Sequence, residues 1–304
     1  MLVKSGFEVS DEIFERMICF DVIARRDKTL LVIKVQVNID SFNKYSAMEL
    51  KVVSNFLDGF PLVIGNHSGV GQIQDGAIYI RYGIPIMSPQ TIFDYLVDDK
   101  PPLIFAAPGG FFVKIDGDIL KKVRESRGIS LGTLADAVGV SRRAIQMYEN
   151  GMNAMVDVAV RLQNYLNEPI IKPCKPFESE YNPEELENIK SELGAKEPSD
   201  REVIEHLKVL GYEVFPTQRS PFDAITANQK ILILTGIEDK SKSLKHRAKV
   251  IHNISQLTDK HSVFIVRKSD FKQNIEGTPI IALHELKTID DFNEIIELIA
   301  ERAV

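Results

Sequence analysis

One sequence pattern occurs twice in this chain, and this repeat constrains the fold more than any other feature. Residues 6–35 and 211–237 each contain Gly-aromatic-Glu-Val, then Phe-Asp, then a lysine and an apolar run, with three extra residues in the opening turn of the first copy. A repeated sequence pattern predicts a repeated structural unit, so we expect the two copies to share a fold. The expected matches are Gly6 with Gly211, Asp21 with Asp223 and Lys28 with Lys230.

Each copy continues with segments of the same type in the same order. The paired segments are 43–57 with 242–257, 60–65 with 262–267, 82–87 with 277–283, and 89–99 with 288–303. Short apolar runs separated by helical segments predict a small mixed sheet flanked by helices. We expect the order helix, three strands, helix, strand, and then a final short strand and helix. Only the second copy has a full opening helix, at 199–214, so either the first sheet is partly uncovered or the true start lies upstream of Met1.

The region between the copies, residues 116–169, predicts four helices. Asp118, Ser130 and Ser141 are residue types that cap helix N-termini, and we expect them to begin the first three helices. Gly139 stands where the second helix has to end in the left-handed conformation, which glycine adopts without steric penalty. A fourth helix precedes the proline that closes the region.

The third helix of this region has one inward and one outward face. Helical geometry directs Ile145 and Tyr148 toward the core. The side chains then turned outward or along the flank are Arg142, Arg143, Gln146 and Met147. This is the helix-turn-helix arrangement, in which the N-terminal part of the second helix of the pair enters the major groove of DNA.

These residues give the region its resemblance to the Cro/C1 repressor class of helix-turn-helix (HTH) domains. The matching residues are Leu134, Ala135, Gly139, Val140, Ser141, Ile145, Tyr148, Glu149 and Gly151. The expected HTH core is Leu134, Ala135, Gly139, Val140, Ile145 and Tyr148, and the expected DNA-binding residues are Ser141, Arg142, Arg143, Gln146 and Met147. The chain departs from the class at Leu131, where many relatives have a phosphate-contacting glutamine. The alternative is a helical pair used only for packing or for protein contacts.

The two flanking copies resemble the restriction-endonuclease and Holliday-junction-resolvase superfamily, in which an Asp and an acidic-x-Lys triplet hold Mg²⁺. The first copy has Asp21 and Lys34, but its triplet at 32–34 reads Val-Ile-Lys; the second has Asp223 and reads Leu-Thr-Gly at 234–236. Metal-dependent cleavage needs at least two carboxylates to hold the ion. We therefore expect no catalytic residues, no metal and no cofactor, and interpret both aspartates as turn-end carboxylates with a backbone hydrogen bond.

The charge distribution places any contact with DNA in the middle of the chain. The formal net charge is -6, so no global positive field attracts nucleic acid. Residues 111–167 are the exception, with eight Lys and Arg against six Asp and Glu. Two distant cysteines and six scattered histidines argue against a zinc site or disulfides, and no apolar run is long enough to span a membrane. We expect a cytoplasmic protein.

Taken over the whole chain, the order of these parts resembles the archaeal family of HTH-type transcriptional regulatory proteins. The expected fold class is α/β plus all-α, with two mixed α/β nuclease-like units flanking a Cro/C1-type domain of four to five helices. The expected domains are 1–108 and 201–304 for the nuclease-like units, 109–172 for the HTH domain and 173–200 for a linker with one helix. The resemblance implies a sequence-specific regulator that binds double-stranded DNA, as a homodimer, with no effector indicated. The alternative is a DNA-processing or junction-binding protein of the nuclease superfamily, targeted by its HTH domain.

Overall fold

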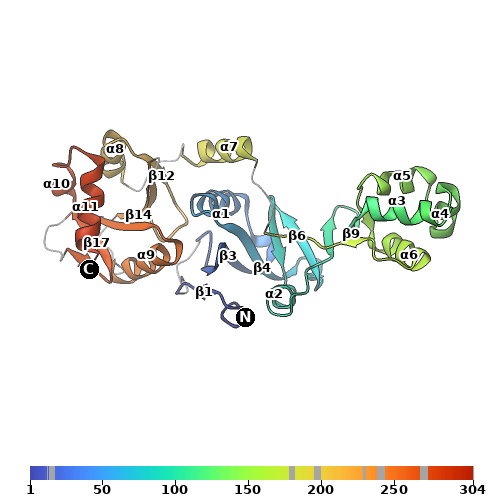
Figure 1. Cartoon of the computed structure of the whole chain (residues 1–304). Coiled ribbons are helices and arrows are strands. Elements are labelled where there is room, and N and C mark those ends of the chain that lie inside the picture. The colour runs from blue at the N-terminus through green and yellow to red at the C-terminus, as the bar shows by residue number, and fades with distance from the viewer. Residues whose placement is uncertain are drawn as a thin grey trace. The chain divides into compact units, whose positions relative to one another are not determined.

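The computed structural model describes residues 1–11, 13, 18–177, 182–194, 200–228, 231–237, 244–267 and 273–303 (Figure 1). The chain forms two compact units. The first consists of Met1–Val35, Ser41–Leu62 and Glu180–Val304, and the second of Gln36–Asp40 and Val63–Ser179. Both nuclease-like copies therefore contribute to the first unit, whereas the HTH domain lies in the second.

The N-terminal copy has seven strands and two α-helices between Glu8 and Leu96, a region described except at 12 and 14–17. The strands are β1 (Glu8–Val9), β2 (Val22–Arg26), β3 (Thr29–Asn38), β4 (Phe60–Ser68), β5 (Gly71–Gln72), β6 (Ala77–Arg81) and β7 (Ile84–Met87). The helices are α1 (Lys44–Phe56) and α2 (Pro89–Leu96), with 3-10 turns at Val3–Ser5 and Ile39–Ser41. A single 3-10 turn thus stands where the opening helix would be.

The C-terminal copy repeats this order and adds the opening helix. Its elements are α8 (Arg201–Val209), β12 (Glu213–Pro216), β13 (Ala224–Ala227), β14 (Leu232–Ile237), α9 (Leu244–Thr258), β15 (His261–Val266), β16 (Asn274–Ile275), β17 (Thr278–Ala282), α10 (Leu283–Leu286) and α11 (Phe292–Arg302). The stretch before it carries the one expected helix, α7 (Pro183–Gly194).

The strand pairing confirms that the two copies have the same fold. In both, the first three strands are antiparallel, and Val22 pairs with Ile33 as Ala224 pairs with Thr235. The fourth strand of each copy then pairs in parallel with the last one, β4 with β7 and β15 with β17. Asp21 and Asp223 both precede the second strand directly, and Gly6 and Gly211 both have positive φ. The match of Lys28 with Lys230 lies outside the described residues.

The last part of each copy differs from the expected single strand, because both copies end in a β-hairpin. The turns are Tyr82-Gly83 in β6–β7 and Glu276-Gly277 in β16–β17, and all four residues have positive φ. Two successive left-handed residues form the tight turn that matches the twist of a hairpin. The equivalence of the terminal helices was also wrong, since α10 and not α11 follows the last strand directly, as α2 does.

The segment 101–118, which contains the boundary expected between the first nuclease-like unit and the HTH domain, is structured. It forms β8 (Ile104–Ala107) and β9 (Gly110–Ile115), an antiparallel hairpin whose β8 pairs in parallel with β6. Two further strands, β10 (Ala154–Met155) and β11 (Ile171–Lys172), also pair with β9. Because β10 and β11 belong to the HTH region, β9 holds that region to the sheet of the second compact unit.

Within the first compact unit, the two copies exchange contacts through their opening loops. The loop of the C-terminal copy approaches α1, where the carboxylate of Glu49 accepts hydrogen bonds from the amides of Gln218 (3.1 Å) and Arg219 (2.7 Å) and from the Ser220 hydroxyl (3.0 Å). The Cys19 amide in turn donates to the Arg219 carbonyl at 2.6 Å. Burial raises the pKa of the Glu49 carboxyl, and the hydrogen bonds to it oppose that shift.

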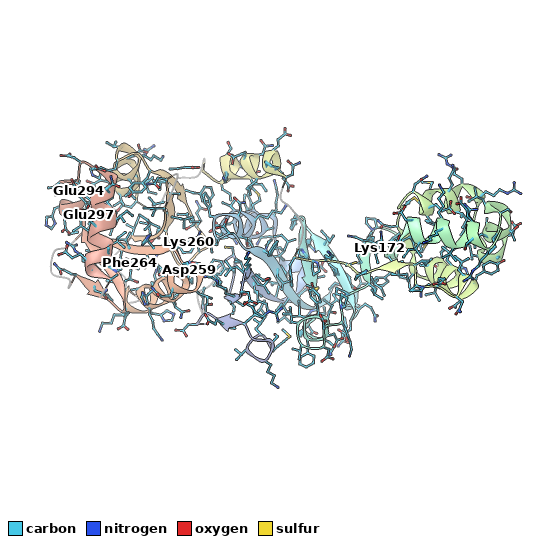
Figure 2. All side chains as sticks on the ribbon, viewed as in Figure 1. Lys172, Asp259, Lys260, Phe264, Glu294 and Glu297 are labelled. Carbon is cyan, nitrogen blue, oxygen red and sulfur yellow. The ribbon has the colours of Figure 1, made fainter. Side chains whose placement is uncertain are left out.

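The opposite contact is made by the N-terminal copy on α9. The Asp11 amide donates to the side chain of Asn253 (2.9 Å), and its carboxylate pairs with Lys249 (3.0 Å). The turns that end α1 and α9 are joined by the ion pair of Lys260 with Asp58 at 3.0 Å; Lys260 is labelled in Figure 2. The two copies are therefore packed reciprocally, each against the central helix of the other.

We expect Glu49→Gln to lower the free energy of unfolding of the first compact unit by about 2 kcal/mol, because the amide leaves part of the donor set without an acceptor. Urea denaturation followed by intrinsic fluorescence measures this. The control is Glu192→Gln, since Glu192 forms only an exposed ion pair with Lys44 at 3.3 Å and its loss should cost under about 0.5 kcal/mol. Equal stability of the two variants would contradict the role given to Glu49.

Candidate nucleic-acid interface

The HTH region contains four helices, as expected, and all of its residues are described. They are α3 (Gly117–Ser126), α4 (Leu131–Val138), α5 (Arg142–Glu149) and α6 (Val156–Leu166). Ser130 and Ser141 cap α4 and α5 by accepting hydrogen bonds from the amides of Thr133 and Ala144. The cap of α3 was placed wrongly: it is Asp116 and not Asp118, because the Asp116 carboxylate accepts from the Ile119 amide at 3.1 Å.

The expected core residues lie where the pattern placed them. Leu134 and Ile145 are fully buried, Ala135 and Tyr148 are nearly so, and Val140 is half-buried. Gly139 ends α4 with φ 70° and ψ 42°, the left-handed conformation expected there. The turn between α4 and α5 is therefore set by a glycine that a side chain would strain.

The core of this region continues into the strand that precedes it. Val113 and Ile115 of β9 pack in the same apolar cluster as Leu134 and Ile145. Lys172 of β11, labelled in Figure 2, forms an ion pair with Asp116 at 3.1 Å. The helices and the β9 strand thus share one core, which gives α5 a defined position on a strand scaffold.

All five residues expected to contact DNA are exposed on or beside α5. They are Ser141, Arg142, Arg143, Gln146 and Met147. The hydroxyl oxygen of Ser141 is used as the cap acceptor at 3.1 Å, and Met147 is 40% exposed. The side chains of Arg143 and Gln146 have neither a hydrogen bond nor an ion pair within the described part of the chain.

The two arginines at the start of α5 differ in their surroundings. The guanidinium of Arg142 lies across α4 at Gly132, so close that a Cβ on that glycine would meet its Nε at 2.7 Å. Gly132 is the second residue of α4, so Arg142 is held beside the N-terminus of that helix. Arg143 has no such contact. The absence of a side chain at Gly132 leaves room for the Arg142 guanidinium at that position.

A buried ion pair, which the sequence pattern did not reveal, joins α3 to α5. Arg124 contacts both carboxylate oxygens of Glu149, one of them at 3.1 Å, and also donates to the Ile129 carbonyl at 3.0 Å. The two side chains are 10% and 7% exposed. Glu149 stood among the residues of the Cro/C1 resemblance, but Arg124 lies 25 positions earlier and only the fold brings it to that carboxylate.

The nuclease-like copies hold their aspartates in the manner expected from the sequence. Asp21 and Asp223 each accept a hydrogen bond at 2.6 Å from a backbone amide 14 residues later, at Val35 and Ile237. Each is also paired with a cation. The partner of Asp21 is Lys34 of β3 at 2.9 Å, and that of Asp223 is Arg247 of α9 at 2.6 Å. Both carboxylates are thus occupied by groups of the protein.

In both triplets, the position where the superfamily has its acidic residue lies in the core. Val32 and Leu234 stand there, and both are 0% exposed. In the C-terminal copy the lysine position is Gly236, and the ring of Phe264, labelled in Figure 2, lies so near that a Cβ would meet it at 2.6 Å. Among the described residues no group of three His, Cys, Asp or Glu side chains could hold a metal ion.

Two family models match parts of this chain. Residues 1–102 match the model of the PD-(D/E)XK superfamily domain, and residues 120–172 match a helix-turn-helix model. Over the full chain the protein is 35% identical to a protein of Methanocella arvoryzae, 38% to one of Natronomonas pharaonis and 39% to one of Methanosarcina mazei, covering 94 to 96% of each. No solved structure matches.

The fold and the two family matches define an HTH protein that carries a PD-(D/E)XK-like domain. The three relatives are each named "Putative HTH-type transcriptional regulatory protein", and the chain belongs to their family. Within the described residues, no helix combines the length and apolar character that crossing a bilayer requires.

We expect Glu149→Gln to destabilise the HTH region by about 3 kcal/mol, because it leaves the buried Arg124 charge with only the exposed Glu125 carboxylate, at 3.3 Å, as a counter-charge. Amide hydrogen exchange in α3 and α5 measures the local effect. Glu168→Gln is the matched control, since Glu168 pairs with Arg127 at 3.5 Å on the surface and its loss should cost under about 0.5 kcal/mol. Unchanged exchange in the Glu149 variant would show that the pair does not hold these helices together.

Proposed function

We propose that this protein is a sequence-specific regulator of transcription that binds double-stranded DNA in the cytoplasm through α5. The observation that carries the proposal is the exposed surface of Arg142, Arg143, Gln146 and Met147 on a helix whose opposite face is locked into the HTH core. Arginine and glutamine are residue types that form paired hydrogen bonds with base edges in the major groove. The names of the relatives support a role in transcription.

The distribution of charge also supports DNA binding by this surface. The chain as a whole is acidic, but Arg142 and Arg143 stand without an acidic partner among the described residues. Phosphate contacts supply most of the non-specific affinity of proteins for DNA, and local positive charge is enough to provide them. The N-terminus of α5, capped by Ser141, adds a partial positive charge that favours a phosphate.

The two arginines have different roles in this proposal. Arg142 lies beside Gly132 near the N-terminus of α4 and contacts the DNA backbone. Arg143 lies on the same side of α5 as Gln146, one helical turn apart, and contacts a base edge. The placement of Arg142 over Gly132 supports this division of labour.

A small HTH domain with few cationic residues binds a single half-site weakly. We propose a homodimer whose two α5 helices reach half-sites about 34 Å apart, one turn of the double helix. The nuclease-like copies then act as packing and dimerisation domains and not as an enzyme. This role is supported by the protein cations that occupy Asp21 and Asp223.

Arg143→Ala is expected to relax base preference, reducing discrimination between operator and random duplexes by about 1–3 kcal/mol. Arg142→Ala is expected to weaken binding to both duplexes alike and to reduce the salt dependence of the affinity by about one counterion. A salt series on a selected site and on random DNA distinguishes them, with Lys208→Ala in α8 as a control for simple loss of charge. If neither arginine variant alters affinity, α5 does not bind DNA.

We expect no Mg²⁺-stimulated cleavage of supercoiled or branched DNA, because the acidic position of the triplet is Val32 in one copy and Leu234 in the other. Agarose gels of plasmid and four-way-junction substrates with Mg²⁺ or EDTA measure this. Asp21→Asn and Asp223→Asn should behave like the unmodified protein. Nicking that depends on Mg²⁺ and disappears in either variant would favour the alternative, a DNA-processing enzyme targeted by its HTH domain.

A further inference from the structure

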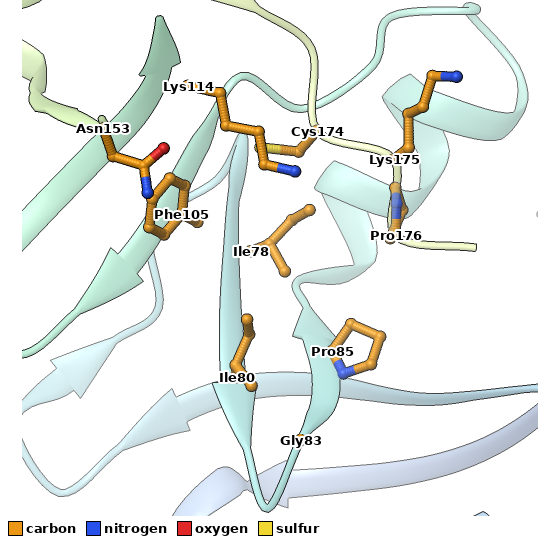
Figure 3. A pocket seen from close by; sticks show the side chains of 10 residues that line it. All are labelled: Ile78, Ile80, Gly83, Pro85, Phe105, Lys114, Asn153, Cys174, Lys175 and Pro176. Atoms are coloured by element: carbon orange, nitrogen blue, oxygen red, sulfur yellow. The ribbon is translucent and has the colours of Figure 1, made fainter. Parts of the chain in front are cut away.

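The second compact unit contains a pocket of about 290 Å³ next to the strands that carry the HTH region (Figure 3). Its walls come from β6 and β7, from β8 and β9, and from the chain on either side of α6. The lining residues on the sheet are Ile78, Ile80, Gly83, Pro85 and Phe105, and those nearer the HTH region are Lys114, Asn153, Cys174, Lys175 and Pro176.

The pocket is apolar except at one end. Ile78 and Pro85 are buried and Phe105 is half-buried, whereas Ile80, Lys114 and Asn153 are exposed; none of the lining residues is acidic. Figure 3 shows the ammonium group of Lys114 directed between Ile78 and Cys174 into the pocket, with the Asn153 amide beside Phe105. An apolar chamber with a few convergent polar groups is the usual form of a small-molecule site.

The positive charge of Lys114 is not neutralised by the protein. Within the described residues its ammonium makes neither an ion pair nor a hydrogen bond. Its partner across the strand pair β9–β11 is Lys172, a second cation, whose own counter-charge is Asp116. The Asn153 side chain is likewise without a hydrogen-bond partner in the described part of the chain. This end of the pocket therefore favours an anion.

We propose that this pocket binds a small organic anion, a carboxylate with an aliphatic or aromatic tail. The carboxylate accepts hydrogen bonds from Lys114 and Asn153, and the tail packs against Ile78, Pro85 and Phe105. The pocket volume lies at the lower end of the range for ligand sites, which limits the ligand to on the order of 10 non-hydrogen atoms.

A ligand bound in the pocket acts on the HTH region through the chain segments that connect them. Lys114 lies on β9, two positions before the Asp116 cap of α3, and Asn153 directly precedes β10 and α6. A ligand that bridges these residues to β6 stabilises one placement of the β9 strand. An effect on DNA binding follows from this geometry, and that part rests on the proposed function.

The test uses 4-phenylbutyrate and its uncharged analogue 4-phenylbutan-1-ol as probes of the full chain, without DNA. Calorimetry should show the carboxylate binding at least about tenfold more tightly than the alcohol, because a charge-assisted hydrogen bond is lost in the alcohol. Isoleucine methyl NMR locates the site, with the largest shifts expected at Ile78 and Ile80. Probe-induced shifts confined to other isoleucines would overturn the assignment.

Lys114→Met should abolish the preference for the carboxylate while leaving the methyl spectrum of the unliganded protein otherwise unchanged, which shows that the variant folds. Lys122→Met in α3 is the matched control, since the Lys122 side chain is exposed and does not line the pocket, and the preference should persist. No binding of 4-phenylbutyrate, equal binding of both probes, or an unaltered preference in Lys114→Met would overturn the proposal. Because DNA is absent, these outcomes are independent of whether α5 binds it.

Discussion

The buried carboxylate of Glu49 is the interaction on which the arrangement of the two nuclease-like copies depends. It lies in the middle of α1, yet its hydrogen-bond donors are the amides of Gln218 and Arg219 and the Ser220 hydroxyl, in the opening loop of the other copy. A buried charge is tolerated only when such donors surround it, and in their absence its desolvation is costly. Within the first compact unit, the opening loop of the C-terminal copy therefore supplies the donors that α1 of the N-terminal copy requires.

Contacts within each copy also engage the aspartate at its nuclease-like centre. A metal-binding aspartate needs an open position and a second acid. Here each aspartate accepts a hydrogen bond from the third strand of its own copy and forms an ion pair with a cation of the protein. The cations come from different elements in the two copies, Lys34 from β3 and Arg247 from α9. In the C-terminal copy, Phe264 fills the space beside Gly236. In both copies the aspartate is therefore engaged in contacts within the protein.

The HTH region is connected to the rest of the second unit by a strand as well as by a linker. β9 contributes Val113 and Ile115 to the helical core and pairs with β8, β10 and β11. In our proposal, a ligand bound in the pocket at Lys114 acts on α5 through this strand. Arg124 and Glu149 hold α5 against α3, so that this effect reaches the whole domain.

The sequence by itself determined the repeat, the four helices of the HTH region and the exposed residues of α5. These features depend on local preferences, such as serine caps, a left-handed glycine and helical spacing, which a short window of residues expresses. Only the tertiary structure decided the Tyr82 and Glu276 hairpin turns, the β8–β9 pairing, the placement of Arg142 over Gly132 and the pairing of Arg124 with Glu149. The turns carry Tyr and Glu where Asn or Asp would have signalled a hairpin, and the other contacts join residues whose proximity follows from packing. Local preference could not predict them, because the free energy that selects them comes from burial and pairing between segments far apart in the chain.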